Sequence, residues 1–269
     1  WFSSWLWPFA TLGWPEETED LKRFYPNSLM VTGADIIFFW VARMIMAGLE
    51  FRGEIPFQHV YFTSILRDAK GRKMSKSLRN SPDPIEMMER YGADAVRFSL
   101  IYLTPTGQDL LFDEKRLETG KFFANKIWNA ARLVQMRLGD EDLTKVRESA
   151  LRLSLADRWI LSRYANAVKN VTRNLKTYRF NEAANALYQF AWAEYCDWYL
   201  EMAKPRFREN DPAAIATARL VLAESLKLMH PFMPFITEEL NEKLGNSGFL
   251  DQVAFPAAGA RDESVEREF

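Results

Sequence analysis

The stretch Val60–Ser77, which reads VYFTSILRDAKGRKMSKS, places a strand-like run directly before a basic loop. Its first seven residues are rich in β-branched and aromatic side chains, a composition typical of a strand. Gly71 then marks a tight turn, and residues 67–79 carry six cations against one acid, Asp68. The whole chain has a net charge of -1, so this is a local positive patch rather than a general affinity for polyanions.

The end of this stretch has the side chains needed to grip a triphosphate. Lysines aimed at a leaving pyrophosphate stabilise the charge that develops on it, and serine hydroxyls can fix a loop by bonding its backbone. We therefore expect Lys73, Lys76, Ser75 and Ser77 to act in transfer of a nucleotidyl group from ATP. Such a loop can close over a nucleotide and retract afterwards. The alternative is an exposed basic loop without a ligand.

Residues 1–110 alternate strand-like and helical segments. Leu29–Thr32 is an apolar run of strand length, and Asp35–Gly48 is a helical segment that is apolar on nearly every side. A further helix is expected to start at Pro84, with Asp83 as its N-cap. The order of strand, helix, strand and helix predicts an α/β layer with a parallel sheet. The apolar helix is too short to span a bilayer, so we expect it to be buried.

Residues 111–256 have a different pattern of apolar and polar residues, which is typical of long amphipathic helices. Apolar residues recur at helical spacing between Asn181 and Lys204 and again between Ile160 and Leu175, which gives each segment one continuous apolar face. Proline residues that follow Asp211 and Met233 are expected to begin two more helices. This region is predicted to be an antiparallel helix bundle.

Two charged segments accompany the bundle. Residues 139–154 are expected to connect two helices, and residues 257–269 form a charged tail that is either disordered or the start of a further module. The chain begins without an initiator methionine, which suggests a piece of a longer protein.

Composition and cysteine count argue against a disulfide-stabilised protein and against a zinc-binding protein. The chain is 48% hydrophobic and 26% charged, as in ordinary soluble domains. A single cysteine, Cys196, allows no internal disulfide and indicates a cytosolic protein in which it is buried. His59 and His230 are far apart, and one cysteine cannot complete a zinc site, so we expect no protein-bound metal.

Lys73–Ser77 matches the signature loop of the class I aminoacyl-tRNA synthetases. The surrounding sequence resembles the valyl-tRNA synthetase family over nearly the whole chain. The stretches that carry this resemblance are Trp1–Ser4, Leu6–Phe9, Thr11–Pro15 and Phe38–Met44. The resemblance implies the C-terminal part of a Rossmann-type nucleotide-binding domain in residues 1–110, followed by an anticodon-binding helix bundle.

The function that this resemblance implies is that of a valine–tRNA ligase. Such an enzyme activates valine with ATP and Mg²⁺ to valyl-adenylate and transfers it to tRNA(Val), and the parent enzyme would be a cytoplasmic monomer. Valine's own carboxylate is the nucleophile, so the protein contributes positioning and charge stabilisation.

The resemblance also assigns residues to the two small substrates. Trp1, Ile36 and Trp40 would form the amino-acid pocket, in which two indoles and a branched aliphatic side chain leave a tight apolar slot. The spacing of four puts Ile36 and Trp40 on one helix face. Residues expected to bind ATP are Gly33, Asp35, Met74 and Lys76. On the residues alone an aspartate such as Asp35 is more often a helix N-cap, and the two roles can coexist.

For tRNA, the resemblance points to the segment Lys121–Arg132. Lys126 and Arg132 would lie near the anticodon, where arginine offers planar stacking and forked hydrogen bonds. The alternative for each is a solvated helix face. The family often has an aromatic residue after this arginine, and Leu133 in that place puts base stacking there in doubt.

The sequence departs from the family within the basic loop. After Ser77 the family usually continues Leu-Gly-Asn, whereas this chain has Leu78-Arg79-Asn80. If this position needs a positive φ, Arg79 costs about 1 kcal/mol.

Two alternatives remain open from the sequence. An isoleucine–tRNA ligase shares the loop and the architecture. A non-catalytic tRNA-binding module is the other, because the histidine-rich His-x-Gly-His signature of class I enzymes is absent from this sequence. We therefore expect the chain alone neither to activate an amino acid nor to bind ATP tightly.

Overall fold

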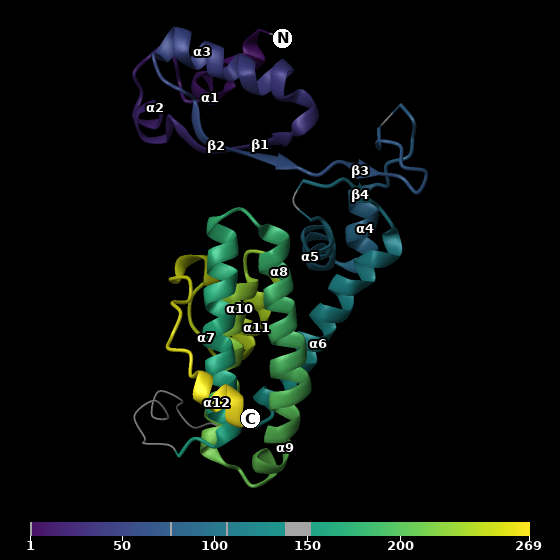
Figure 1. The fold of residues 1–269 in the computed structure, drawn as a ribbon, viewed down its shortest axis with the longest axis vertical. Coiled ribbons are helices and arrows are strands. Elements are labelled where there is room, and N and C mark those ends of the chain that lie inside the picture. Colours follow the sequence, from purple (N-terminus) through teal and green to yellow (C-terminus); the bar gives the residue numbers. More distant parts are fainter. Residues whose placement is uncertain (1, 76, 106, 138–151) are drawn as a thin grey trace. The chain divides into compact units, whose positions relative to one another are not determined.

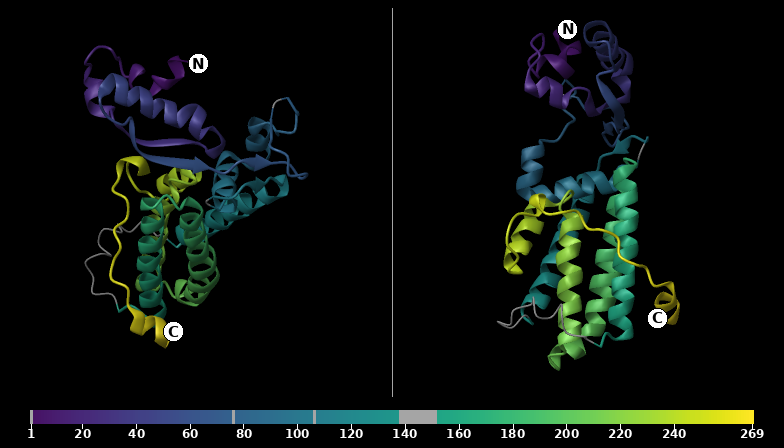
Figure 2. Two further views of the ribbon diagram at one scale, coloured as in Figure 1. Left: turned by 45° about the horizontal axis from the view of Figure 1, so that its top comes forward. Right: turned by 90° about the vertical axis from the view of Figure 1, so that its left-hand side faces the viewer.

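The computed structural model describes residues 2–75, 77–105, 107–137 and 152–269. The fold is mostly helical, with two small parallel sheets (Figures 1 and 2). It contains two compact units. The first comprises Trp1–Lys73 with Thr106–Leu111, and the second comprises Met74–Pro105 with Phe112–Phe269. The predicted connection at 139–154 lies, up to residue 151, outside the described residues.

The first unit is built on a pair of parallel strands. β1 (Asn27–Gly33) pairs with β2 (Phe57–Thr63), and Gly33 stands opposite Thr63 at the carboxyl ends. Parallel strands need a crossover connection, which here contains α3 (Ala42–Arg52). The strand predicted near Leu29–Thr32 and its parallel pairing are confirmed.

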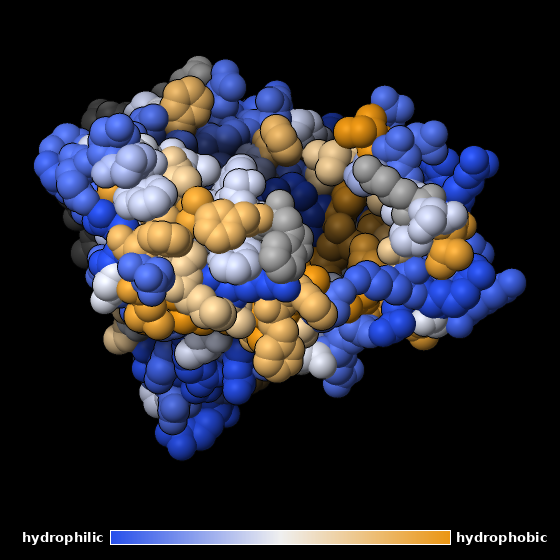
Figure 3. All heavy atoms as spheres, turned by 90° about the horizontal axis from the view of Figure 1, so that it is seen from above, coloured by the Kyte–Doolittle hydropathy of each residue, from blue (hydrophilic) through white to orange (hydrophobic). Residues whose placement is uncertain are grey.

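The helical segment after β1 is irregular and half exposed. Ala34–Ile36 forms a 3-10 turn and Ile37–Val41 a π-helical turn before α3 begins. Met44 is buried, but Phe38 and Phe39 are 80% and 68% exposed. The expectation of a buried helix is therefore wrong for one face, because apolar composition predicts burial only where other elements cover the helix. Orange side chains gather on the surface seen in Figure 3, the kind of surface that often contacts other molecules.

Two short helices cover the other side of α3. α1 (Trp7–Ala10) and α2 (Glu19–Phe24) contribute Phe9 and Leu21 to a small buried cluster with Tyr25. The hydroxyl of Tyr25 donates to the Glu54 carbonyl oxygen at 3.1 Å, which fixes the cluster to the segment before β2.

A second parallel pair carries the chain into the basic loop. β3 (Leu66–Arg67) pairs with β4 (Leu110–Leu111). The Asp109 carboxylate accepts hydrogen bonds from Arg67 Nε at 2.6 Å and from the Ile65 amide at 3.3 Å. This carboxylate therefore fixes the start of the loop to β4.

The second unit consists of helices with well-marked starts. Its helices are α4 (Pro84–Tyr91), α5 (Ala93–Leu103), α6 (Glu118–Gln135), α7 (Leu155–Lys176), α8 (Phe180–Tyr188), a π-helical segment (Gln189–Tyr199), α9 (Leu200–Arg208), α10 (Pro212–Met229), α11 (Pro234–Lys243) and α12 (Glu263–Glu268). Asp83 and Asp211 accept from the amides two residues on, at 2.8 and 2.9 Å, which confirms the N-cap predicted at Asp83 and the helix start predicted at Pro212. Figure 1 shows α7 and α8 side by side and running in opposite directions.

Most of the core of this unit is one cluster of apolar side chains from α5 to α12. A smaller cluster of Met87, Val96 and Leu117 joins α4, α5 and the segment before α6. Ile160, Val168 and Val171 on α7 are fully buried, as the helical periodicity predicts. Asp94 on α5 is also buried, and its carboxylate accepts from the amides of Phe235 and Ile236 at the start of α11. A carboxylate at a helix N-terminus satisfies amides that lack partners within the helix.

The segment 257–269, for which the sequence left disorder or a further module open, ends in α12. Val265 of this helix is 2% exposed. The Ser162 hydroxyl of α7 accepts from the Asp262 amide at 2.8 Å and contacts Glu266 at 2.6 Å. The end of the chain is therefore packed on α7.

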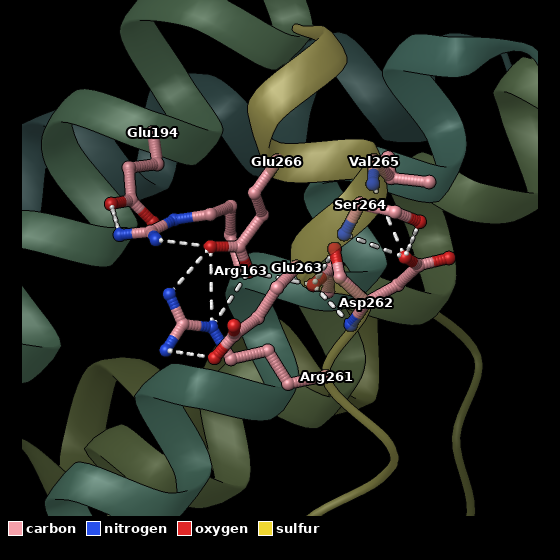
Figure 4. A network of polar contacts seen from close by, with 9 residues as sticks. Arg163, Glu194, Arg261, Asp262, Glu263, Ser264, Val265 and Glu266 are labelled. Atoms are coloured by element: carbon pink, nitrogen blue, oxygen red, sulfur yellow. Dashed lines mark hydrogen bonds and ion pairs between the residues drawn. The ribbon is translucent and has the colours of Figure 1, made fainter.

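An ionic network joins α12 to α7 and to the π-helical segment (Figure 4). Arg163 donates to Glu194 and, at 3.0 Å, to Glu266. Arg261 donates to Glu266 at 2.7 Å. The hydrogen bond from Arg261, with those from Ser162 and Arg163, lowers the pKa of Glu266 to about 2 against the effect of its burial.

We expect this network to make the packing of α12 sensitive to acid. A carboxylate whose pKa is lowered on folding stabilises the fold above its unfolded pKa, and the contribution is lost as the pH falls through the folded value. Replacing Glu266 by Gln should therefore lower the free energy of unfolding by about 1–3 kcal/mol near neutral pH. The difference from wild type should shrink as the pH falls from 4.5 towards about 2.

Urea denaturation across this pH range measures the effect. Glu268→Gln is a matched control, because Glu268 is an exposed acid on the same helix. A pH-independent loss in the Glu266 variant would show that the network has another role.

Candidate functional site

The basic loop begins with a tightly hydrogen-bonded turn in the first unit. The Asp68 carboxylate accepts from the amides of Lys70 and Arg72 at 3.0 and 2.9 Å, and from Arg72 Nε at 2.8 Å. Gly71 has a φ of 76°, which glycine adopts readily. The predicted tight turn is confirmed, and the one acid of the loop is the residue that forms it.

Lys73 and Asp35, 38 positions apart in the sequence, meet in the first unit. Lys73 Nζ lies 2.5 Å from Asp35 Oδ2. The hydrogen bond from Lys73 lowers the pKa of the Asp35 carboxyl. The other oxygen, Oδ1, lies where a side chain at Gly33 would stand, 2.6 Å from the position of a Cβ. Gly33, Asp35 and Lys73 thus form one cluster at the carboxyl end of β1.

The rest of the loop, in the second unit, is closed by side-chain hydrogen bonds. The Ser75 amide donates to Asn80 Oδ1 at 2.9 Å, and the Leu78 amide donates to Ser75 Oγ at 3.2 Å. Ser75 Oγ and Ser77 Oγ are 3.3 Å apart. Asn80 was not singled out from the sequence, although asparagine is common in such turns. Met74 is half-buried, and Lys76 lies outside the described residues.

Arg79 has a positive φ of 48°. This is the left-handed region, which glycine tolerates and an arginine enters only at a cost. The position therefore has the positive φ on which the expected backbone cost of Arg79 depends. Arg79 stands in a glycine conformation at the position where the family usually has glycine.

The residues expected to hold the amino acid are only partly described. Trp1 lies outside the described residues, whereas Ile36 and Trp40 are half-buried. Ile36 ends the 3-10 turn and Trp40 lies in the π-helical turn, so the face predicted from their spacing is not regular α-helix. Trp40 Nε1 points to the Ser4 carbonyl oxygen at 3.3 Å, which ties this helix to the Trp-Phe-Ser-Ser stretch.

The two basic residues expected to meet tRNA lie on α6 but have different neighbours. Lys126 Nζ donates to Asp197 and lies 5.2 Å from the centre of the Trp192 ring. The hydrogen bond to Asp197 raises the pKa of Lys126. Arg132 is exposed and borders a cavity between α6 and α11. The sequence did not reveal Asp197 or Trp192 as partners, because they lie on another helical segment.

In the part of the chain that the structure describes, no group of three or more histidine, cysteine, aspartate or glutamate side chains is arranged to hold a metal ion. Within the same residues, no helix has the length and apolarity needed to cross a membrane. Cys196 is buried, as predicted, and burial raises the pKa of its thiol to about 12.

Two protein families match the chain. Residues 1–113 match the tRNA synthetases of class I (I, L, M and V). Residues 157–269 match the anticodon-binding domain of tRNA ligases. These matches place the chain among the class I tRNA synthetases.

Curated relatives narrow this class. Valine–tRNA ligases of Thermotoga maritima and Fervidobacterium nodosum are 51% and 53% identical to it over 100% of the chain. That of Bdellovibrio bacteriovorus is 48% identical over 94% of the chain. The chain belongs to the valine–tRNA ligase family. It spans 31% of the length of the first two of these relatives and 29% of the third.

Solved structures support the fold. Agrobacterium radiobacter LeuRS, in a ternary complex with tRNA and LeuAMS, is similar over 97% of the chain and 32% of its own, with a TM-score of 0.74 and 19% identity. Mycobacterium tuberculosis methionyl-tRNA synthetase bound by methionyl-adenylate covers 93% of the chain and 50% of its own, with a TM-score of 0.74 and 23% identity.

The strain at Arg79 gives a direct test of the loop geometry. Arg79→Gly should stabilise the turn relative to Arg79→Ala, because alanine removes the charge but keeps the backbone penalty of about 1 kcal/mol. Hydrogen exchange of the Leu78 amide, which bonds Ser75 Oγ, should then be about fivefold slower in the glycine variant. Equal exchange in the two variants would show that the positive φ carries no cost at this position.

Proposed function

We propose that this chain is part of an enzyme that activates valine with ATP and transfers it to tRNA(Val). The observation that carries the proposal is identity of about half the residues to valine–tRNA ligases over the whole chain. The cluster of Gly33, Asp35 and Lys73 supports it, since it joins the first lysine of the signature loop to two residues that are expected to bind ATP. These relatives are named for valine, which does not favour the isoleucine alternative.

In the first proposed step, an oxygen of the valine carboxylate attacks the α-phosphorus of ATP. The bond from this phosphorus to the bridging oxygen breaks, and pyrophosphate leaves with the electron pair. Lys73 and Lys76 stabilise the negative charge that develops on pyrophosphate. Ser75 keeps the loop backbone closed through its bond to Leu78, beside Ser77. Mg²⁺ enters with ATP as part of the substrate.

The remaining small-molecule contacts follow the same assignment. Asp35 accepts hydrogen bonds from the ribose hydroxyls of ATP, and Gly33 allows the close approach of the nucleotide. Met74 packs against the nucleotide. Trp40 and Ile36, with Trp1, form the slot for the branched side chain of valine.

In the second proposed step, a terminal ribose hydroxyl of tRNA attacks the carbonyl carbon of valyl-adenylate and AMP leaves. Lys126 and Arg132 on α6 contact the anticodon region. The match of residues 157–269 to an anticodon-binding domain supports tRNA as the partner of the bundle, and α6 itself lies outside the matched residues.

The proposal includes a domain organisation. Residues 1–110 are the C-terminal part of a Rossmann-type catalytic domain, residues 111–256 are an antiparallel anticodon-binding bundle, and residues 257–269 are its tail. In the structure, α4 and α5 belong to the same compact unit as the bundle helices. The boundary near residue 110 therefore stays a prediction. The parent enzyme is proposed to be a cytoplasmic monomer.

Exchange of labelled pyrophosphate into ATP tests the activity. The full-length gene product that contains this chain should support exchange with valine and much less with isoleucine or leucine. The chain alone should give none. Preferred exchange with isoleucine would overturn the assignment to valine, and exchange by the isolated chain would overturn its predicted inactivity.

The role of Asp35 can be separated from that of the rest of the site. Hydrogen bonds to a charged group are worth about 1.5–3 kcal/mol. Asp35→Asn in the full-length product should therefore raise the KM for ATP by roughly 10- to 150-fold. The KM for ATP that lacks both ribose hydroxyls should change little.

Glu50→Gln is a matched control, because Glu50 is an exposed acid on α3 of the same unit. An equal rise in KM for both nucleotides would remove Asp35 from the ribose and leave it only as the partner of Lys73.

A further inference from the structure

One arginine of the first unit, Arg43, lies close to two aromatic rings. It is in the first turn of α3, and its guanidinium carbon lies 5.6 Å from the centre of the Trp5 ring and 5.8 Å from that of the Phe39 ring. At both distances a cation is attracted to the face of an aromatic ring. Trp5 belongs to the beginning of the chain and Phe39 to the π-helical turn before α3, so Arg43 joins two segments that are far apart in the sequence.

A hydrogen bond joins the same two segments beside this contact. Trp40 Nε1 donates to the Ser4 carbonyl oxygen at 3.3 Å. Ser4 and Trp5 lie in one 3-10 turn, Ser3–Trp5, which packs on α3. Trp40 and Arg43 are three positions apart in a helical segment, so their side chains emerge close together. The turn is therefore held at two points, by an indole and by a guanidinium.

The guanidinium suits this contact for physical reasons. It is planar, so it can lie flat on an indole, and it is more weakly hydrated than an ammonium group. Arg43 and Trp5 are both half-buried, and the attraction between cation and ring grows as water is removed from the pair. None of the three residues of the turn Ser3–Trp5, which the structure describes in full, is buried. Contacts with the helical segment thus decide where the turn lies.

These contacts bear on the slot proposed for the side chain of valine. Trp1, at the start of the same stretch as Ser4, is proposed to form one side of the slot, and Ile36 and Trp40 the other. The width of such a slot depends on the distance between the two segments. One methylene group in an apolar pocket changes binding by only about 10- to 200-fold, so a small movement of one side alters which amino acid fits.

We propose that Arg43 is a positioning residue that sets the width of the valine slot. Its guanidinium holds Trp5, and with it the Trp-Phe-Ser-Ser stretch, against the segment that carries Ile36 and Trp40. Arg43 acts through the two aromatic rings rather than through contact with valine. The inference rests on the proposed function, because it adds a residue to the same amino-acid site.

Exchange of labelled pyrophosphate into ATP by the full-length gene product tests this role. Arg43→Met keeps a long apolar side chain but removes the cation, and should raise the KM for valine by about 2- to 30-fold. The KM for ATP should stay nearly unchanged, because other residues are proposed to bind ATP. The preference for valine over isoleucine in kcat/KM should fall by a similar factor, since a wider slot accepts the larger side chain better.

Arg52→Met is the matched control. Arg52 is half-buried, lies in the last turn of the same helix and has its guanidinium carbon 5.7 Å from the centre of the Tyr25 ring. It also pairs with Glu17, so its loss should destabilise the first unit at least as much. Because Arg52 contacts Tyr25 rather than Trp5, the KM for valine and the preference over isoleucine should stay near those of wild type. Thermal unfolding measures the loss of stability in each variant.

Arg43→Lys is a second variant, in which a cation remains but the planar group is lost. It should raise the KM for valine by no more than Arg43→Met does, and should still lower the preference for valine. If Arg43→Met does not fold, Arg43→Lys decides the question, since an unchanged preference in this variant would overturn the proposal.

Three results with folded Arg43→Met would also overturn it. These are an unchanged KM for valine, an equal rise in the KM for ATP, and an equal rise in the KM for valine in Arg52→Met. Preference of the wild-type product for another amino acid would instead overturn the proposed function, and the effect of Arg43→Met would then be measured with that amino acid.

Discussion

The helical unit depends on one buried carboxylate, that of Asp157, which is 0% exposed. It accepts from the hydroxyl of Tyr199 and from Arg206, each at 2.8 Å, and from the amide and the hydroxyl of Ser154, also at 2.8 Å. Burial by itself would raise the pKa of Asp157, but the hydrogen bonds from Arg206 and Ser154 outweigh it and the pKa is lowered. The charge is therefore kept inside the protein because every lone pair has a partner.

This carboxylate links local structure to packing. With Ser154 it forms the capping box that starts α7, and through Arg206 it contacts the last turn of α9. Arg206 also donates to Asp211, the N-cap of α10, at 2.8 Å. The starts of two helices and the end of a third are thus fixed by one ionic network. An isolated buried charge would be costly, so each of these residues constrains the others.

Much of this unit could be predicted from the sequence because its signals are local. Apolar spacing predicted α7 and the helical segments from α8 to α9. Asp211 with the proline that follows it predicted the start of α10. Contacts between distant residues could not be predicted in this way. Asp94 accepts from amides more than 140 positions later, and no periodicity indicates which helix start a buried aspartate will meet. The exposed face at Phe38 and Phe39 was missed for a related reason, since burial depends on what packs there.

In the candidate site, too, local features could be predicted from the sequence and contacts between distant residues could not. The turn at Asp68 follows from short-range rules about acids and glycines, and the positive φ at Arg79 was indicated only by the glycine that the family usually has there. The carboxylate partner of each cation could not be predicted from either source. Lys126 is neutralised by Asp197, whereas no such acid meets Arg132 within the described residues. A cation that already has a carboxylate partner must lose it before it can bind phosphate, so its net gain is smaller. Lys126 and Arg132, which look equivalent in the sequence, therefore differ in the charge that is available to an anion, and only the fold distinguishes them.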